Sequence, residues 1–478
     1  MKRKQKNRIL ENVLVEDYAG EGKCISRIDG KAIFIEKAVP GDVVDLQLTK
    51  SKKDWAEGYP VRFHTFSNDR VKPICKHFGV CGGCQWQMLP YEHQLKYKQK
   101  QVEETLKRIG KISLPPIFPI IGAEETENYR NKLEFTFSSK EFFATPPVDK
   151  NEIYKTGAAG FHARGWFDKV VEIEKCWLQA DPSNAIRNFI SSFARANDFT
   201  FYDYKSHIGF LRNAQVRTST TGEVMVNIVF ADDDSEKQML LMENVKKQFP
   251  EITALLYTIN TKFNDSIYDL KPIVYSGNGF IIEKLIEKDS GKIFCFKVGP
   301  KSFFQTNTKQ AEKLYNTTKE FAELTGNETV YDLYCGTGSI GIFVSQFAKK
   351  IIGVEMITAA IEDAKENAKL NNVSHAEFFD GDVITVCNDD FFATNGRPDV
   401  IITDPPRAGM HEKLVKKILE IEAPTVVYVS CNPSTQARDL NLLGEKYFVT
   451  KVQPVDMFPH TQHIENVVQL KLKTKFTQ

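Results

Sequence analysis

The last third of the chain alternates short apolar runs with stretches of helical periodicity. From residue 301 onwards, runs such as TVYDLY, KIIGVEM, DVIITDPP and TVVYVSC are separated by amphipathic segments. Strands that alternate with helices are typical of α/β domains, so we expect a doubly wound, Rossmann-like sheet over residues 301–478. The segment 301–326 is expected to be a helix that ends at Gly326.

The first part of the chain has a different pattern. Short apolar runs are interrupted by turn signals such as Asp29–Gly30 and Pro40–Gly41, which predicts a small β-barrel over residues 1–63. After a stretch rich in cysteine and glycine, residues 91–110 predict one amphipathic helix that ends at Gly110.

Residues 64–300 combine the two kinds of pattern. LEFTFSS, EVMVNIVF, ALLYTIN and KIFCFKVGP predict strands, and one helix is expected near residues 182–197. We therefore expect a mixed α+β central domain. Residues 139–158, which contain Pro146–Pro147, predict an inserted loop.

Composition limits the function classes. The chain has 478 residues, 42% hydrophobic and 26% charged, as in a globular protein of several domains. The formal net charge of +1 gives no indication of a nucleic-acid partner. A run of about 18 apolar residues, which a membrane-spanning helix needs, is missing. The basic start MKRKQKNRIL is not followed by an apolar signal core. We expect a cytoplasmic monomer without a membrane partner.

Polar and reactive groups end successive strands of the expected α/β sheet. DLYCGTGSIG (332–341) follows a strand and opens a helix, and its glycines permit close backbone approach to a ligand. Glu355 ends the next strand, where a carboxylate can accept hydrogen bonds from a ribose diol. Ligands of open α/β sheets bind at the carboxyl ends of the strands. The expected cofactor site is therefore lined by Tyr334, Gly336, Gly338, Glu355, Asp382 and Asp404.

The glycine pattern alone does not identify the cofactor, because G-x-G-x-x-G also binds nicotinamide dinucleotides. The segments DPPRAG (404–409) and SCNP (430–433) decide between the two cofactors. Two prolines stiffen the first loop, so that Asp404 can project towards a ligand. Cys431 is expected beside it at the rim of the sheet, where a cysteine is more often reactive than structural.

A thiolate at this rim has a specific use in methyl transfer to a pyrimidine. Carbon 5 of uracil is a poor nucleophile, but thiolate addition at carbon 6 produces an enolate that can attack the methyl group of S-adenosylmethionine. A base must then remove the carbon-5 proton, and Glu465, at the head of a late apolar strand, is our candidate. The target uracil must leave the base stack of the RNA before the enzyme can reach it. Phe304 is a candidate aromatic ring on which a nucleobase could stack.

Three of the nine cysteines form a cluster. CKHFGVCGGC places Cys75, Cys81 and Cys84 in C-x5-C-x2-C spacing, and the glycines between them allow the thiolates to converge. A fourth ligand must come from elsewhere in the chain. Zinc and an iron–sulfur cluster both suit four cysteines, so the residues alone leave both open.

Taken together, these motifs resemble the RNA uridine-5-methyltransferases, and most closely the bacterial 23S rRNA members that carry an iron–sulfur cluster. The resemblance covers nearly the whole chain. It implies that residues 1–63 are a TRAM domain, an oligonucleotide-binding type of barrel, and that the substrate is RNA, ribosomal rather than transfer RNA. It implies cofactor contacts for Gln305, in QTN, and for Ser339, and it supports the nucleophile Cys431.

The resemblance also implies a [4Fe–4S] cluster in preference to zinc, with Cys176 as the fourth ligand. HIEN, with His463 and Glu465, matches the family's proton-acceptor segment. Two departures are Tyr334, where the ribosomal members would have phenylalanine, and the long segment from Cys84 to Cys176.

Three other interpretations are distinguished by their motifs. A radical enzyme using the same cofactor would have C-x3-C-x2-C spacing. An amino-group methyltransferase would place an aromatic residue after Asp-Pro-Pro, where this chain has Arg407. A non-catalytic RNA-binding module would not require Cys431 and Glu465 together.

Overall fold

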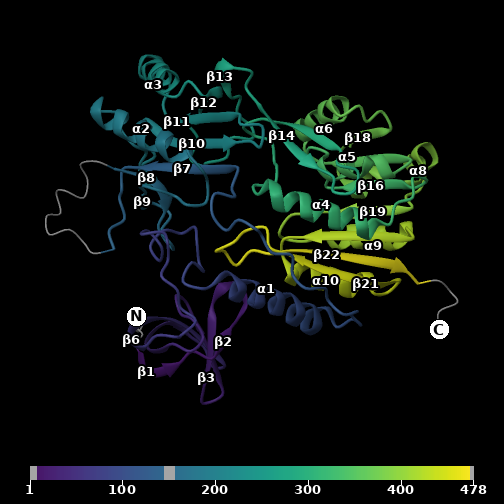
Figure 1. Ribbon diagram of the computed structural model, residues 1–478, viewed down its shortest axis with the longest axis horizontal. Coiled ribbons are helices and arrows are strands. Elements are labelled where there is room, and N and C mark those ends of the chain that lie inside the picture. Colours follow the sequence, from purple (N-terminus) through teal and green to yellow (C-terminus); the bar gives the residue numbers. More distant parts are fainter. Residues whose placement is uncertain (1–7, 145–156, 474–478) are drawn as a thin grey trace.

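The computed structural model describes residues 8–144 and 157–473, so most of the expected loop insertion at 139–158 lies outside the described residues. The chain is arranged as a small N-terminal sheet, a central sheet and a C-terminal sheet (Figure 1). A helix near the start of the chain, α1, lies between the N-terminal and C-terminal sheets. Among the described residues, no helix combines the length and apolarity needed to cross a bilayer.

The N-terminal sheet has six strands in the order β1-β5-β6-β4-β3-β2 and wraps around its own apolar core. Buried and partly exposed residues alternate along β5, as expected where one face of a sheet packs inwards. This agrees with the expected barrel. The strands are β1 (Ile9–Leu14), β2 (Asp17–Tyr18), β3 (Cys24–Ile28), β4 (Lys31–Ile35), β5 (Val43–Ser51) and β6 (Trp55–Thr65), with the short turn η1 (Gly20–Gly22).

The central sheet has seven strands in the order β13-β12-β11-β10-β7-β8-β9, and only β11 and β12 pair in parallel. Helices α2 (Ser183–Ala196) and α3 (Ser235–Gln248) contribute apolar side chains to its core. The helix near 182–197 is confirmed, whereas α3 was not predicted. The strands are β7 (Lys132–Ser138), β8 (Ala158–His162), β9 (Val170–Glu172), β10 (Leu211–Thr218), β11 (Val224–Phe230), β12 (Ile252–Ile259) and β13 (Ile273–Gly277).

The C-terminal sheet confirms the doubly wound α/β prediction. Its order is β18-β17-β16-β19-β20-β22-β21, with β16 to β20 parallel and β22 inserted antiparallel beside β20. The strands are β16 (Thr329–Leu333), β17 (Lys350–Glu355), β18 (Ala376–Asp380), β19 (Val400–Thr403), β20 (Thr425–Ser430), β21 (Tyr447–Val455) and β22 (Glu465–Leu472). The helices are α4 (Thr308–Ala322), α5 (Ser339–Val344), η4 (Ser345–Phe347), α6 (Thr358–Leu370), α7 (Val383–Val386), α8 (Asp389–Asn395), α9 (Glu412–Ile421) and α10 (Pro433–Leu443).

The expected helix over 301–326 is shorter in the structure. The α4 helix begins after Asn307, whose side chain accepts a hydrogen bond from the Gln310 N–H and caps the helix. It ends at Glu323, which takes a left-handed conformation, and so it stops before the predicted end at Gly326. Residues 301–307 lie outside the helix, and this leaves Gln305 on a connecting segment.

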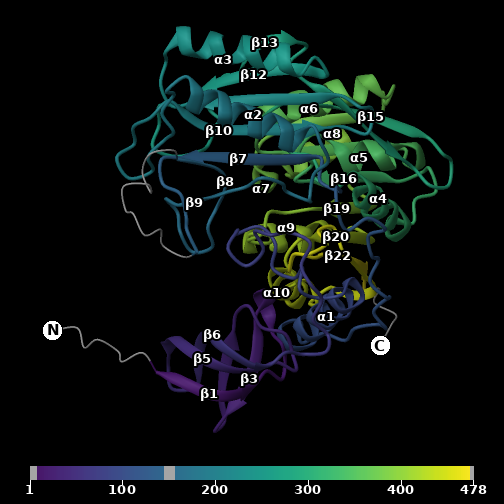
Figure 2. The same cartoon turned by 60° about the vertical axis from the view of Figure 1, so that its left-hand side comes forward.

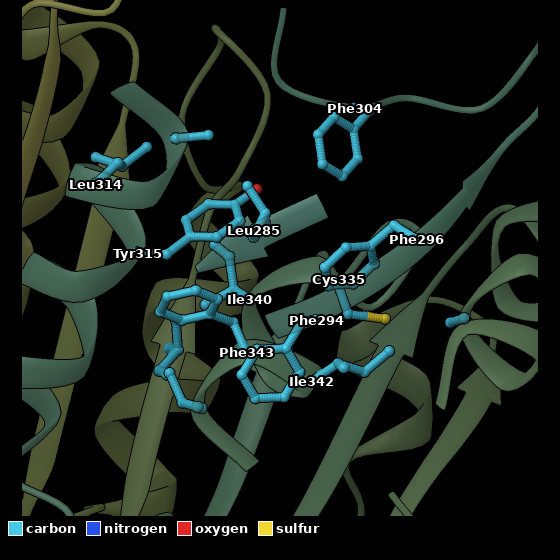
Figure 3. Packing of buried hydrophobic residues seen from close by; sticks show 14 of the residues in the cluster. Leu285, Phe294, Phe296, Phe304, Leu314, Tyr315, Cys335, Ile340, Ile342 and Phe343 are labelled. Carbon is cyan, nitrogen blue, oxygen red and sulfur yellow. The ribbon is translucent and has the colours of Figure 1, made fainter. Parts of the chain in front are cut away.

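The two faces of the C-terminal sheet pack into separate cores. On one face, α4 and α5 meet the two-stranded ribbon β14 (Ile281–Ile286) and β15 (Ile293–Val298), and aromatic rings such as Phe294 and Phe343 fill the space (Figure 3). On the other face, α1 (Tyr91–Thr105) and its π-helical extension η2 (Leu106–Gly110) pack against α10. The predicted helix 91–110 is thus confirmed, and it lies below β21 and β22 (Figure 1).

Candidate functional site

The glycine-rich loop joins β16 to α5 at the carboxyl edge of the C-terminal sheet. Tyr334, Gly336 and Gly338 all have positive φ angles of 62°, 54° and 75°, so the chain turns sharply there. A tyrosine in this conformation is strained, whereas glycine adopts it freely. Gly338 precedes α5, and the first N–H groups of that helix therefore face the edge where a cofactor would bind.

Glu355 lies at the end of β17 and supports the same loop. Its carboxylate accepts hydrogen bonds from the N–H groups of Gly336 at 3.2 Å and Ile357 at 3.0 Å. Asp382, expected beside it, is exposed and caps the short helix α7 by accepting from the N–H of Ile384 at 2.9 Å. Asp382 therefore caps a helix in this structure, whereas Glu355 contacts the glycine-rich loop directly.

Gln305 lies on the segment that precedes α4, and Ser339 is the first residue of α5. The Gln305 side chain is buried, and the Ser339 hydroxyl lies 3.0 Å from the Tyr315 hydroxyl on α4. The expectation that Phe304 presents a ring to a base is wrong, because Phe304 is only 4% exposed and packs against Phe296 (Figure 3). Its neighbour Phe303 is 65% exposed, and the Phe303 carbonyl faces the Thr337 hydroxyl of the loop at 3.5 Å.

Cys431 and Glu465 lie across from each other at the same edge. In the antiparallel pairing of β20 with β22 the last pair is Ser430 with Asn466, and Cys431 and Glu465 are the next residues of the two segments. The Glu465 charge also acts on the Cys431 thiol, whose pKa it helps to raise. The side chain of Gln436 on α10 holds this junction, because it donates to the carbonyls of Tyr428 and Asn466. The two residues that were proposed as nucleophile and base from sequence therefore meet in the structure.

Burial and mutual repulsion set the charges of this group. Burial, with added repulsion from Glu465 and Asp404, raises the pKa of the Cys431 thiol to about 12. Burial raises the pKa of Asp404 to about 7 and that of Glu465 well above its ordinary value, the latter also because Asp404 lies nearby. The thiol is therefore protonated at neutral pH, Asp404 can exchange a proton there, and Glu465 keeps its proton to a higher pH than an ordinary carboxyl group does.

Arg407 and His463 form a pair that the motifs did not predict. The guanidinium Nη2 donates to the ring Nδ1 of His463 at 2.7 Å. Burial and the nearby Arg407 charge lower the pKa of His463 to about 4, so the ring is neutral and can accept this bond. The Arg407 carbonyl in turn accepts from the side chains of Asn432 and Thr435, which ties the DPPRAG loop to the SCNP loop.

The segment 456–462, which leads into His463 and Glu465, is held from several sides. Asp456 is fully buried, and its carboxylate accepts from Lys98 Nζ at 2.6 Å and from the Tyr91 hydroxyl at 2.8 Å, both on α1. Lys98 is also fully buried, and burial lowers its pKa. The His460 carbonyl accepts from the N–H groups of Gln85 and Trp86, directly after the cysteine cluster. This anchoring needs contacts far apart in sequence, so no local motif indicated it.

The four candidate ligand cysteines line one cavity of about 180 Å³, together with mainly apolar side chains. Burial raises the pKa of Cys81 and Cys84 to about 12, and the other thiols of the group raise both values further. The structure thus brings Cys176 to the three clustered cysteines, despite the long segment between them. Within residues 8–144 and 157–473, no three His, Cys, Asp or Glu side chains gather closely enough to hold one metal ion.

A cleft of about 650 Å³ lies elsewhere, between α4, β14 and the segment 121–131. None of the predicted site residues lines it. Its lysines Lys309 and Lys313 pair with Glu125 and Glu124. We therefore place the chemistry at the carboxyl edge of the sheet, where the reactive groups converge, and not in this cleft.

The sequence is similar to known protein families and to individual proteins. Residues 388–473 match the tRNA (Uracil-5-)-methyltransferase family, residues 313–425 the methyltransferase small domain and residues 4–61 the TRAM domain. An RNA methyltransferase of Bacteroides thetaiotaomicron, named as uncharacterized, is 52% identical over 459 residues, which cover 95% of this chain and 100% of that protein. A similarly named protein of Porphyromonas gingivalis is 45% identical over 470 residues, 96% of this chain and 100% of its own length.

A solved structure resembles the whole chain. The Pyrococcus abyssi tRNA (uracil-54, C5)-methyltransferase in complex with S-adenosyl-L-homocysteine is 27% identical, with a TM-score of 0.73. The match covers 96% of this chain and 100% of that one. The likeness therefore includes all three sheets, and not the C-terminal sheet alone.

Proposed function

Because this chain belongs to the RNA uracil-5-methyltransferase family and is an S-adenosylmethionine-dependent RNA methyltransferase, we propose that it methylates carbon 5 of a uridine through a covalent intermediate on Cys431. The observation that carries the proposal is that Cys431 and Glu465 directly adjoin the last β20–β22 pair, Ser430 with Asn466, and that the Glu465 and Asp404 charges act on the Cys431 thiol. We further propose three domains, with boundaries at 1–63, 64–300 and 301–478. The TRAM match over residues 4–61 supports the first of these.

Each side chain at the edge has a distinct part in the proposed reaction. The Cys431 thiol gives its proton to a neighbouring carboxylate, for which Asp404 has a suitable pKa of about 7, and the sulfur adds to carbon 6 of the uracil. S-adenosylmethionine supplies an electrophilic methyl group, which carbon 5 of the resulting enolate takes up. Glu465 then removes the carbon-5 proton, and the electrons of that bond re-form the ring double bond as the sulfur leaves carbon 6.

The remaining groups would bind and orient the two substrates. Glu355 and the backbone of Gly336 and Gly338 would bind the cofactor, together with Ser339, which follows Gly338, and Gln305. Tyr334 and Asp382 were predicted for the same site, and Asp382 would serve it mainly by fixing the turn after β18. The exposed Phe303 ring is placed to stack on a base that has left its helix.

Ribosomal RNA and transfer RNA are the two candidate substrates. The cysteine cluster favours 23S ribosomal RNA, as the sequence resemblance implies. The solved relative acts on transfer RNA, which makes the same chemistry on tRNA the alternative. Mapping 5-methyluridine in ribosomal and transfer RNA from cells that lack the gene distinguishes the two, because only the true target loses the modification.

Replacing Glu465 by glutamine is expected to trap the covalent protein–RNA adduct. The amide cannot take the carbon-5 proton, so the methylated intermediate cannot eliminate Cys431. The adduct should appear as a slower band on a denaturing gel. The double variant Cys431→Ala/Glu465→Gln should give no such band, and the exposed Glu420→Gln should behave as the unaltered protein. A folded Glu465→Gln variant that turns over normally would refute the role of Glu465.

We also propose that Cys75, Cys81, Cys84 and Cys176 hold a [4Fe–4S] cluster, with zinc as the alternative. Four thiols facing one largely apolar cavity are a suitable set of ligands. The cavity of about 180 Å³ exceeds the roughly 30 Å³ of a water molecule and so offers more space than a single ion needs. The role of the cluster would be to fix the cysteine loop, since the proposed methyl transfer requires no electron.

Protein purified without oxygen is expected to show a broad absorbance near roughly 400 nm, which iron–sulfur centres give. Replacing Cys81 by serine should remove the absorbance, and Cys295→Ser, on β15, should retain it as a matched control. Colourless protein with one zinc per chain would contradict the cluster and support the alternative. Iron and zinc contents measured on the same sample give this result independently of activity.

A further inference from the structure

The turn between β8 and β9 exposes two adjacent aromatic rings. Trp166 is 46% exposed and Phe167 is 66% exposed. The Ala163 N–H donates to the Lys169 carbonyl across the turn at 2.9 Å, and Gly165 takes a φ of 80°. Single exposed apolar residues are common on protein surfaces, but two neighbouring rings on a rigid turn suggest a contact surface.

Lysine side chains accompany both rings. Lys169 Nζ lies 4.2 Å from the centre of the Trp166 ring, and Lys205 Nζ lies 5.9 Å from that of Phe167. Asp168, which follows Phe167, is buried and pairs with Lys205 at 2.8 Å, and the Lys205 N–H donates to Asp203. The exposed surface of the turn thus consists of aromatic rings with lysine side chains beside them, which suits a ligand with flat rings and negative charge.

A second exposed aromatic pair extends this surface. The turn that carries Lys205 also carries His207, whose ring stacks on Phe263 with centres 4.4 Å apart and planes at 29°. Phe263 is 75% exposed. Trp166, Phe167, Lys205, His207 and Phe263 form what we call the aromatic strip.

The strip begins next to the barrel and the cysteine loop. Arg164 at the start of the turn lies 3.9 Å from Glu36 of the N-terminal sheet, and its N–H donates to the carbonyl of Val80 in the cysteine loop. The same loop continues to Gln85, whose N–H contacts His460 ahead of Glu465. Figure 2 shows β8 and β9 above the barrel, on the side of the central sheet that faces it. RNA bound to the barrel can thus extend onto the strip.

We propose that the aromatic strip is a stacking platform for unpaired nucleotides that flank the target uridine. The inference rests on the proposed function only in taking the ligand to be the RNA substrate. Bases of any sequence can stack on exposed rings, and lysines beside the rings neutralise the phosphates. The strip would hold a single-stranded segment while the target base enters the site. A second copy of the chain is the competing occupant, and the test below distinguishes it.

The test uses the full chain with Trp166→Ala/Phe167→Ala and a fluorescein-labelled oligouridylate of about 12 nucleotides. We expect the dissociation constant to rise by roughly 10- to 100-fold, because two stacked bases lose their partners. Binding of a fully paired duplex of the same length should change far less. The KM for substrate RNA should rise, while kcat at saturating RNA stays unchanged. Phe448→Ala, which removes an exposed ring on β21, serves as the matched control and should bind normally.

The conservative variant Trp166→Phe should recover most of the affinity, which a folding defect would not explain. Equal oligouridylate binding by the double variant and the unaltered protein would overturn the platform. A loss of self-association in sedimentation, with RNA binding unchanged, would assign the strip to a protein interface and overturn it also. If the strip binds the oligonucleotide but uridine carbon 5 is never methylated, the proposed function fails while the platform stands.

Discussion

Replacing Cys431 by alanine is expected to abolish methyl transfer, to less than roughly one ten-thousandth of the original rate. Without the sulfur, carbon 5 of uracil is not activated, and no other described group is placed to add to carbon 6 as Cys431 is. Binding of S-adenosylmethionine should persist, because the glycine-rich loop belongs to a different strand end. Transfer of a tritiated methyl group to RNA measures the rate, and titration calorimetry measures cofactor binding.

The control for this variant is Cys295→Ala, which removes a partly buried thiol from β15, far from the proposed nucleophile in the chain. It should keep its full activity. An alanine variant at position 431 that turns over at a normal rate would exclude the covalent mechanism. Loss of both turnover and cofactor binding would instead indicate that Cys431 supports the structure of the site.

Replacing Lys98 by methionine is expected to give the second large effect, a loss of stability. The substitution leaves the Asp456 carboxylate buried without its cation, and breaking a buried ion pair in this way costs about 3–5 kcal/mol. The melting temperature should fall by on the order of 10 °C in differential scanning calorimetry. The barrel and central sheet could melt separately, so the transition that changes identifies the affected part of the molecule.

Two further variants show whether the charge is responsible. Lys416→Met removes a lysine of an exposed pair on α9 and should leave the melting temperature unchanged. The double variant Lys98→Met/Asp456→Asn removes both charges of the buried pair and should be more stable than Lys98→Met alone. If the single and double variants melt together, the pair is not the source of the stability.

The sequence predicted the C-terminal sheet well, because its strands are buried on both faces and separated by amphipathic helices. The groups at its carboxyl edge follow from chain order alone, since each reactive residue ends its own strand. The position of Glu465 opposite Cys431 could not be derived in this way, because β22 enters the sheet antiparallel beside β20, out of chain order. The resemblance to a known family supplied that pairing.

The predictions failed where contacts distant in sequence decide the structure. The helix α3 was missed, because Met239 and Leu240 face outwards and obscure its apolar stripe. Phe304 and Phe303 are adjacent and chemically identical, and only the packing shows which ring is buried. Likewise, nothing around Lys98 distinguishes it from the exposed lysines of the same helix until its partner Asp456 is known.

The anchoring of segment 456–462 has a consequence for how the catalytic edge is assembled. The carbonyls of Asp456, Met457, Pro459 and His460 accept hydrogen bonds from Gln310, Asn307, Tyr129 and the 85–86 backbone, respectively. Tyr129 and residues 85–86, which are translated early, thus hold part of a segment that is translated near the end. Residues 301–478 alone would keep the contacts of Gln310 and Asn307 but would lose those at Pro459 and His460, the part of the segment that leads into Glu465.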